Sequence, residues 1–205
     1  DEMSSRGLGD VYKRQVWAAD PQQAVFAGGC FWCLEHDLEV LPGVISAESG
    51  YSGGTTANPT YQQVSSGRTG HAESVLVRFD PDRISYATLL RAFWRNVDPL
   101  DGGGQFCDRG SSYRPVIFTG SADQLEQASE SERLARQELG TSGALAVAIE
   151  PLKRFWPAED YHQDYAERQA LTYNFYRWRC GRDARLDGVW GEQARLPVVW
   201  KTATA

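Results

Sequence analysis

Two cysteines with two residues between them, Cys30 and Cys33, are the residues of this 205-residue sequence best suited to redox or metal chemistry. They follow the apolar run 24–27 and the pair Gly28-Gly29, and they begin a segment whose apolar spacing predicts a helix. Free N–H groups and partial positive charge at a helix N-terminus favour a thiolate over a thiol. We therefore expect a lowered pKa for Cys30 and a reactive role for the pair.

Three kinds of chemistry suit this pair. A thiol–disulfide oxidoreductase would use Cys30 and Cys33 as a dithiol. The βαβ pattern of thioredoxin-like proteins is not evident in this sequence, which argues against it. A zinc or iron–sulfur site would add Cys107 and Cys180, although the sequence holds no second C-x-x-C motif. A lone nucleophile would need another cysteine to resolve it. Two buried structural cysteines are the alternative without chemistry.

The elements that must position these cysteines indicate a mixed α+β fold, because strands and helices alternate without a strict βαβ rhythm. The expected strands and helices follow in chain order: strand 24–27, helix 30–41, strand 44–50, a short helical turn that starts at 58–61, strand 71–80, a helix capped by Ser85, strand 113–118, helix 122–139 and strand 144–150. The alternation over 71–80 predicts a half-buried strand. After Arg168, aromatic and arginine residues without a clean period predict an irregular tail that wraps the domain.

Composition narrows the class of protein. The chain of 22.8 kDa has 41% apolar and 12% aromatic residues, which argues against disorder. Its formal charge of −6 argues against a general binder of nucleic acid or anionic membranes. No apolar run approaches the roughly 18 residues that span a bilayer. Four cysteines are too few for a disulfide scaffold, and one domain is the expectation at this length.

The N-terminal residues 1–22 are expected to form a flexible leader, either non-native or the remnant of a signal peptide. Val16 and Ala18, in the segment Val16–Asp20, match the −3 and −1 positions of a signal-peptidase site, and a simple linker fits equally well. The compartment, cytoplasmic or periplasmic, therefore stays open. We expect the principal domain over 23–167 and the tail over 168–205.

The segment Gly28–Trp32 closely resembles the signature of the A-type peptide methionine sulfoxide reductases. Further segments match that family in chain order, and the resemblance covers roughly residues 24–166. These segments are Ser49–Gly54, Asn58–Tyr61, Thr69–Glu73, Asp98-Pro99, Cys107–Gly110, Ser112–Arg114 and Glu159–Tyr165. The sequence is thus identified as a member of this family.

The resemblance implies a two-layer α/β sandwich with a ferredoxin-like core and a mainly antiparallel, mixed sheet. It implies reduction of methionine S-sulfoxide, free or in proteins, to methionine. The 23–167 domain would be catalytic, with no metal or organic cofactor and with an external thiol, thioredoxin or dithiothreitol, as reductant. A monomer without nucleic-acid or membrane partners is expected.

By the same resemblance, Cys30 attacks the sulfoxide sulfur, and Glu73 donates a proton to the departing oxygen. Glu73 must then be protonated, so its surroundings should raise its pKa. Tyr61 and Tyr113 match donors to the sulfoxide oxygen, and Asp108 matches a residue that positions a water or donor. Each has a plainer interpretation, such as a solvated carboxylate for Glu73 and a turn residue for Asp108.

Phe31 and Trp32 match the apolar wall that holds the substrate methyl group, and both also suit a hydrophobic core. Among the three histidines, His71 is expected nearest the site, without a catalytic role, and His36 on an exposed helix face.

Attack leaves a sulfenic acid on Cys30, which a second cysteine must resolve. Cys33 stands where many family members have glycine, and it lies one helical turn from the nucleophile. Cys180 lies in the tail, where relatives carry a resolving cysteine, but its surroundings do not match the usual motif. We rank the candidates Cys33, Cys180 and then Cys107, and we keep a Cys30/Cys33 thiol–disulfide oxidoreductase as the alternative function.

Overall fold

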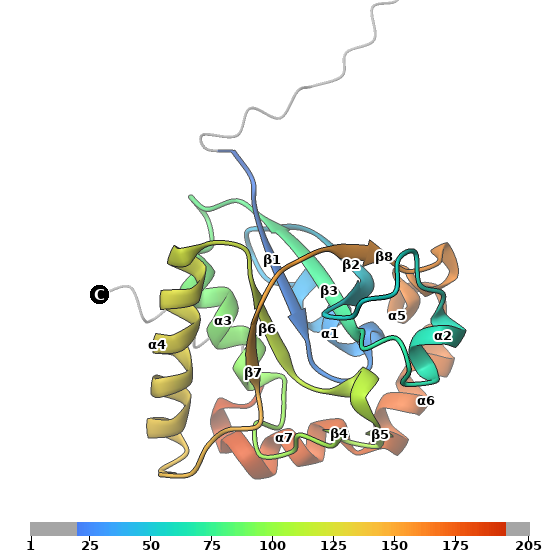
Figure 1. Ribbon diagram of the computed structural model, residues 1–205. Coiled ribbons are helices and arrows are strands. Elements are labelled where there is room, and N and C mark those ends of the chain that lie inside the picture. Colours follow the sequence, from blue (N-terminus) through green and yellow to red (C-terminus); the bar gives the residue numbers. More distant parts are fainter. Residues whose placement is uncertain (1–19, 196–205) are drawn as a thin grey trace, which may run out of the picture.

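A six-stranded sheet with helices packed against it forms the body of the protein in the computed structural model, which describes residues 20–195 (Figure 1). The strand order is β7-β6-β1-β3-β2-β8, and every neighbouring pair is antiparallel except β6 and β7, which are parallel. This arrangement confirms the α+β class and the mainly antiparallel sheet. Residues 1–19 of the expected leader, which include Val16–Ala19 of the proposed cleavage segment, lie outside the described residues, and Gln22, where the leader was expected to end, already belongs to β1.

The strands of the main sheet are β1 (Gln22–Ala27), β2 (Val44–Ser52), β3 (Ala72–Phe79), β6 (Val116–Thr119), β7 (Ala148–Pro151) and β8 (Phe155–Pro157). Two short strands, β4 (Gly104–Gln105) and β5 (Asp108–Arg109), form a separate hairpin whose turn holds Cys107. The helices are α1 (Phe31–Glu39), α2 (Tyr61–Ser65), α3 (Tyr86–Arg95), α4 (Ala122–Glu138), α5 (Tyr165–Arg168), α6 (Ala170–Cys180) and α7 (Arg182–Trp190).

Local sequence explains where the helices begin. The Ser85 side chain caps α3 by accepting from the Thr88 N–H at 3.1 Å. Thr60 and Gln63 form a reciprocal capping box at the start of α2, which fixes the backbone at Tyr61. Both helix starts agree with the sequence prediction.

The principal core lies between one face of the sheet and helices α1, α3 and α4. Phe26 of β1 stacks on Phe93 of α3 with ring centroids 5.1 Å apart, and Leu34 of α1 is fully buried beside them. A smaller apolar cluster, which includes Val25 and Phe118, covers the opposite face. Within residues 20–195, no helix is both long and apolar enough to cross a membrane.

The strand over 71–80 is buried on both faces, so the prediction of a half-buried strand is wrong. β3 lies at the centre of the sheet between β1 and β2, and both apolar clusters enclose it. Its polar residues Glu73 and Ser74 are buried with the rest. Alternation along the sequence therefore marks the position of a buried polar group here and not a solvated face.

The prediction of an irregular tail is also wrong for the described part of it. Residues after Arg168 fold into α6 and α7, which end and begin at Gly181 in the left-handed conformation (φ 69°). Tyr173 is the one buried residue of α6. Two short helices with so few buried positions leave no apolar period in the sequence, because periodicity reflects burial of a continuous face.

Candidate active site

Cys30 occupies the N-cap position of α1, directly after the β1 strand and a pair of glycines. Its carbonyl oxygen accepts from the N–H groups of Cys33 and Leu34 at 3.1 and 3.3 Å. The two glycines permit the tight connection between β1 and α1. A Cβ on Gly28 would lie 2.7 Å from Val97 Cγ1, and Gly29 has φ +83°, a conformation that favours glycine. The fold therefore places the Cys30 sulfur at the point where strand β1 gives way to helix α1.

Glu73 of β3 lies next to this helix start. Its Oε2 accepts from the backbone N–H of Phe31 at 3.1 Å, and the residue is 3% exposed. Burial raises the pKa of Glu73 from 4.5 to about 8, against the opposing effect of the Phe31 hydrogen bond, while the charge of Asp108 adds to the rise. At neutral pH this carboxyl is mainly protonated and can donate.

Tyr61 and Tyr113 present their hydroxyls to the same region. Burial raises the pKa of both phenols, and the charge of Glu73 is the next largest cause for each, which places both near that carboxyl. Both tyrosines therefore remain neutral hydrogen-bond donors. Tyr61 is held by Glu159, whose Oε1 accepts from the Tyr61 N–H at 2.9 Å and whose Oε2 accepts from the Tyr51 hydroxyl at 2.8 Å.

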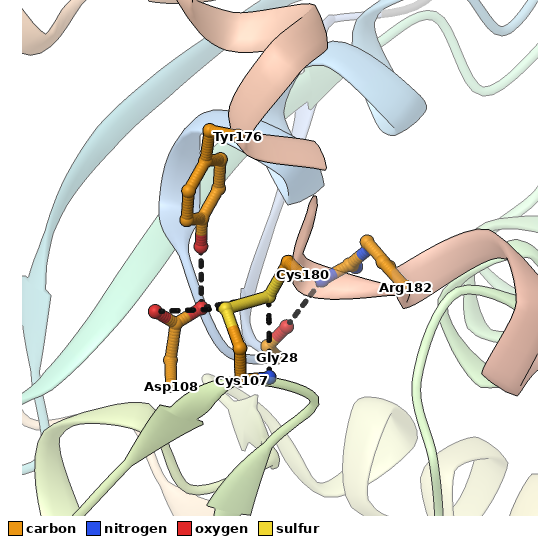
Figure 2. Close-up of a disulfide and its surroundings, with 6 residues drawn as sticks. All are labelled: Gly28, Cys107, Asp108, Tyr176, Cys180 and Arg182. Atoms are coloured by element: carbon orange, nitrogen blue, oxygen red, sulfur yellow. Dashed lines mark hydrogen bonds between the residues drawn. A yellow bond between two sulfur atoms is a disulfide. The ribbon is translucent and has the colours of Figure 1, made fainter. Parts of the chain in front are cut away.

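Asp108 approaches from the β4–β5 hairpin. Its Oδ2 accepts a hydrogen bond from the hydroxyl of Tyr176, which points down from α6 (Figure 2). Burial raises the pKa of Asp108, and the Tyr176 hydrogen bond opposes that effect. A tyrosine from the C-terminal helices thus completes this side of the site.

Aromatic rings line the rest of the site, as expected for an apolar wall. Phe31 is fully buried against the rings of Tyr51, Tyr61 and His162. Trp32 is half-buried and stacks on Tyr165 of α5, with centroids 3.7 Å apart and an 8° interplanar angle. Figure 1 shows α1 and α5 close together, in agreement with this stacking.

His162, and not His71, is the histidine packed against the site. Its Nδ1 accepts from the indole N–H of Trp32 at 3.1 Å, and its ring lies 4.4 Å from that of Tyr61. His71 instead contacts the backbone of Gly54 and Thr56. The sequence analysis expected His71 nearest the site, but it is the ring of His162 that packs on Phe31 and Tyr61.

The pKa of Cys30 is raised, so the expectation that the helix N-terminus lowers it is wrong for this arrangement. Cys30 is 6% exposed, and its removal from water is the largest cause of the raised pKa, with the hydrogen bond to Cys33 next in size. The pKa of Cys33 is lowered, first by its hydrogen bond with Cys30 and further by the charge of Arg182. A hydrogen bond joins the two sulfurs, and thiolate charge is favoured on Cys33 over Cys30.

Cys30 is nevertheless the sulfur that faces the acid and the tyrosines. The charge of Glu73 acts on Cys30, and the charge of Cys30 acts on Tyr61 and Tyr113. Cys33 also acts on Glu73, but the charged groups that act on Cys33 itself are Arg182, Asp37 and Arg177. The geometry therefore gives the two cysteines different surroundings, one suited to attack beside a proton donor and one to forming a stabilised thiolate.

Cys107 and Cys180 are joined in a disulfide, a pairing that the sequence did not predict. They lie 73 residues apart in sequence, and neither stands in a recognisable pairing motif. Within the described part of the chain, Cys107, Asp108 and Cys180 form the one group close enough to hold a metal ion. Because the two sulfurs are bonded to each other, they are not available there as thiolate ligands.

The structure brings Glu73, Tyr61, Tyr113, Phe31, Trp32 and Cys33 around Cys30, with Asp108 beside Tyr176, whereas Cys107 and Cys180 are paired with each other at the Asp108 side. It adds four residues that the sequence reasoning missed: Tyr176, His162, Glu159 and Arg182. Glu159 and His162 lay within a segment already matched to the family. Tyr176 and Arg182 lay in the expected tail, where no pattern distinguished them from other aromatic and basic residues.

Comparison with known proteins agrees with this site. The family model of peptide methionine sulfoxide reductase matches residues 22–194. Peptide methionine sulfoxide reductase MsrA 2 of Caulobacter vibrioides is 51% identical over 175 residues, covering 85% of this chain and 88% of that protein. Peptide methionine sulfoxide reductase MsrA of Bacillus licheniformis is 45% identical over 174 residues, covering 83% of this chain and 94% of that protein.

Solved structures are similar as well. Mxr1 from Saccharomyces cerevisiae in reduced form superposes with a TM-score of 0.70 at 28% identity, covering 75% of this chain and 88% of that one. Methionine sulfoxide reductase A of Corynebacterium diphtheriae gives 0.67 at 30% identity, covering 74% and 76%. The chain belongs to the peptide methionine sulfoxide reductase family, as an A-type member, and is an oxidoreductase.

Proposed function

We propose that the protein reduces methionine S-sulfoxide, free or within proteins, to methionine through a sulfenic acid on Cys30. The observation that carries this proposal is the pairing of Cys30 with a buried, protonated carboxyl. Glu73 binds the N–H of Phe31, the residue next to the nucleophile, and its pKa of about 8 keeps a proton available at neutral pH.

The first step is attack of the Cys30 thiolate on the sulfoxide sulfur. The S–O bond of the substrate breaks, one proton is taken up, and the products are methionine and the Cys30 sulfenic acid. Sulfoxide oxygen leaves poorly as an anion, so the proton from Glu73 and hydrogen bonds from Tyr61 and Tyr113 supply the stabilisation that the transition state needs.

Apolar contacts would set which epimer reacts. Phe31 and Trp32 form a wall on the side of Cys30 that faces the methyl group of the substrate, while the donors fix the oxygen. A sulfoxide sulfur bears oxygen, methyl and chain at fixed chirality. Only one epimer therefore presents oxygen to the acid and methyl to the wall at once.

Cys33 is the resolving cysteine that this geometry favours. It lies one turn along α1 from the nucleophile and shares a hydrogen bond with it, and its lowered pKa favours the attacking thiolate. Condensation of Cys33 with the sulfenic acid forms a disulfide and releases water. An external dithiol of the thioredoxin type then reduces this disulfide and is itself oxidised to a disulfide. The cycle therefore needs no metal or organic cofactor.

The test is reduction of a methionine-sulfoxide peptide with dithiothreitol, with each sulfur epimer followed separately. Wild type is compared with Cys30→Ser. Loss of the S-epimer alone, abolished by the substitution, is the expected result. Activity on protein disulfides with none on sulfoxides would support a thiol–disulfide oxidoreductase in its place.

A further inference from the structure

The reacting groups lie beneath the C-terminal helices. Cys30 is 6% exposed and Glu73 is 3% exposed, and Cys30 and Cys33 form an apolar cluster with Tyr173 that Tyr165 and Tyr176 also contact. A sulfoxide that reacts must touch Cys30 and Glu73 at the same time. Some part of this cover must therefore move before substrate binds.

Tyr176 is the part of the cover that fills the place of the substrate. The Tyr176 hydroxyl donates to Asp108 and is also hydrogen-bonded to the Cys30 sulfur. The Tyr176 ring lies edge-on to that of Trp32, with the two centroids 6.0 Å apart. Tyr176 thus contacts Cys30, assigned above as the nucleophile, Asp108, assigned to positioning a water or donor, and Trp32, assigned to the wall for the methyl group. A phenol in this position and a bound sulfoxide exclude each other.

A disulfide fastens the helix that carries this tyrosine. Cys180 is the last residue of α6, and Cys107 lies in the β4–β5 turn beside Asp108 (Figure 2). The other ties of α6 to the body are non-covalent, chiefly the ion pair of Arg177 with Asp37 at 2.8 Å. Such contacts open and reclose on their own, whereas a covalent bond does not.

The Cys107–Cys180 disulfide is accessible to a reductant. Cys107 is exposed, while Cys30 and Cys33 are buried. On its outer side α6 presents Leu171, Phe175 and Trp178, which are all exposed among residues 20–195. The disulfide therefore lies at the accessible end of an outer helix, where it can be opened without first disturbing the site.

We propose that the Cys107–Cys180 disulfide is a redox latch that holds α6 closed, with Tyr176 occupying the sulfoxide position, and that its reduction admits substrate. An external dithiol gives two electrons and two protons to the S–S bond and becomes a disulfide itself, while Cys107 and Cys180 become thiols. The latch rests on the proposed function, because it governs access to the same nucleophile. It couples substrate entry to the supply of reductant.

The test follows access to Cys30 directly. Cys33→Ser leaves Cys30 as the one free thiol while the latch stays closed, and the matched protein adds Cys107→Ser and Cys180→Ser. The rate of Cys30 alkylation by iodoacetamide is measured at pH 8 by mass spectrometry. We expect alkylation to be at least about tenfold faster without the latch, because the open form of a closed protein makes up at most about 10% of its molecules. Rates within twofold of each other in two folded proteins overturn the latch.

A second form of the test uses no further substitution. The Cys33→Ser protein is reduced with tris(2-carboxyethyl)phosphine, and alkylation of the Cys30 peptide alone is quantified; the same acceleration is expected. Tyr176→Phe in the Cys33→Ser background keeps the cover and removes the hydroxyl, so its rate should stay low. An acceleration there equal to that of latch removal would contradict the steric argument.

Single-turnover reduction separates the latch from the proposed function. Latched and unlatched Cys33→Ser proteins are each mixed with a methionine-sulfoxide peptide in the absence of reductant, and methionine is counted. Methionine formed equally fast by both overturns the latch and leaves the reductase intact. Fast alkylation of the unlatched protein without methionine overturns the reductase and leaves the latch. The expected result is fast formation of methionine in the unlatched protein alone.

Discussion

Substituting Glu73 by glutamine removes the proposed acid while keeping the shape of the side chain. The amide oxygen of glutamine can still accept from the N–H of Phe31, so the start of α1 should be preserved. What is lost is the proton. If Glu73 donates it to the sulfoxide oxygen, the rate at neutral pH should fall by roughly 10²–10⁴-fold, the usual size of general acid catalysis.

The raised pKa of Glu73 determines how much its burial increases the fraction of protonated, competent acid. With a pKa of about 8, Glu73 is roughly 90% protonated at pH 7, whereas an exposed carboxyl with the ordinary value of 4.5 would be about 0.3% protonated. Burial thus raises the fraction of competent acid about 300-fold. Because the pKa of Cys30 lies above that of Glu73, the wild-type rate should stop rising as pH passes about 8, where loss of the acid offsets the gain in thiolate. The rate of the Glu73→Gln protein should instead go on rising with the ionisation of Cys30.

The same shift affects stability, with a defined sign. The folded-state pKa of Glu73 is raised above its unfolded value of 4.5 to about 8, so its favourable contribution is complete below 4.5 and is lost as pH rises through 8. The free energy of unfolding of wild type should fall relative to Glu73→Gln by up to about 5 kcal/mol across this range. Urea unfolding at pH 4.5 to 8.5 measures it.

The assay is single-turnover reduction of a peptide S-sulfoxide by pre-reduced protein between pH 5.5 and 9.5. Glu35→Gln is the matched control, because Glu35 is also a buried carboxyl, with a pKa raised by burial to about 7, but it binds Ser49 and the N–H of Asp164 away from Cys30. The control should keep the levelling-off near pH 8. A Glu73→Gln protein within fivefold of wild type at pH 7, or with the same levelling-off, would refute the role.

Three further predictions concern other parts of the molecule. Tyr113→Phe should lower the rate of the chemical step by about 10²-fold or more with little change in stability, since it removes one donor to the sulfoxide oxygen; stopped-flow kinetics at saturating substrate measures this, and an unchanged rate would remove Tyr113 from the mechanism. Phe93→Ala should cost about 3–5 kcal/mol in urea unfolding, because Phe93 is fully buried against Phe26; a loss below 1 kcal/mol would show that this core contact is dispensable. Thr60→Ala should cost about 1 kcal/mol through loss of the α2 cap, and a larger loss than that of Phe93→Ala would contradict its exposed position.

The sequence predicted those parts of the fold whose burial has a simple period. The α3 helix appears where apolar spacing placed it, with Ser85 as its cap, and the charge-rich α4 helix lies over the residues expected for it. The burial of β3 was missed because a strand enclosed on both faces and a strand with one solvated face share the same alternation when polar residues lie inside. Position in the sheet decides between them, and it depends on long-range pairing that a single segment does not contain.

The site was predictable where a linear motif carries the chemistry. Cys30, Glu73, Tyr61 and Tyr113 all stood in short matched segments, and the fold brings them together. Tyr176 and the Cys107–Cys180 bond depend on how α6 packs back onto α1 and the β4–β5 hairpin. The raised pKa of Cys30 has the same origin, because the burial that raises it comes partly from that distant segment.

The most direct test of the account is a single turnover in the Cys33→Ser protein, reduced beforehand and freed of reductant. Mixed with excess peptide methionine S-sulfoxide and dimedone, it should form methionine and a dimedone adduct in equal amounts, with the adduct on Cys30. Methionine formed with the adduct on another cysteine, or formed equally well after Cys30→Ser, would contradict Cys30 as the nucleophile.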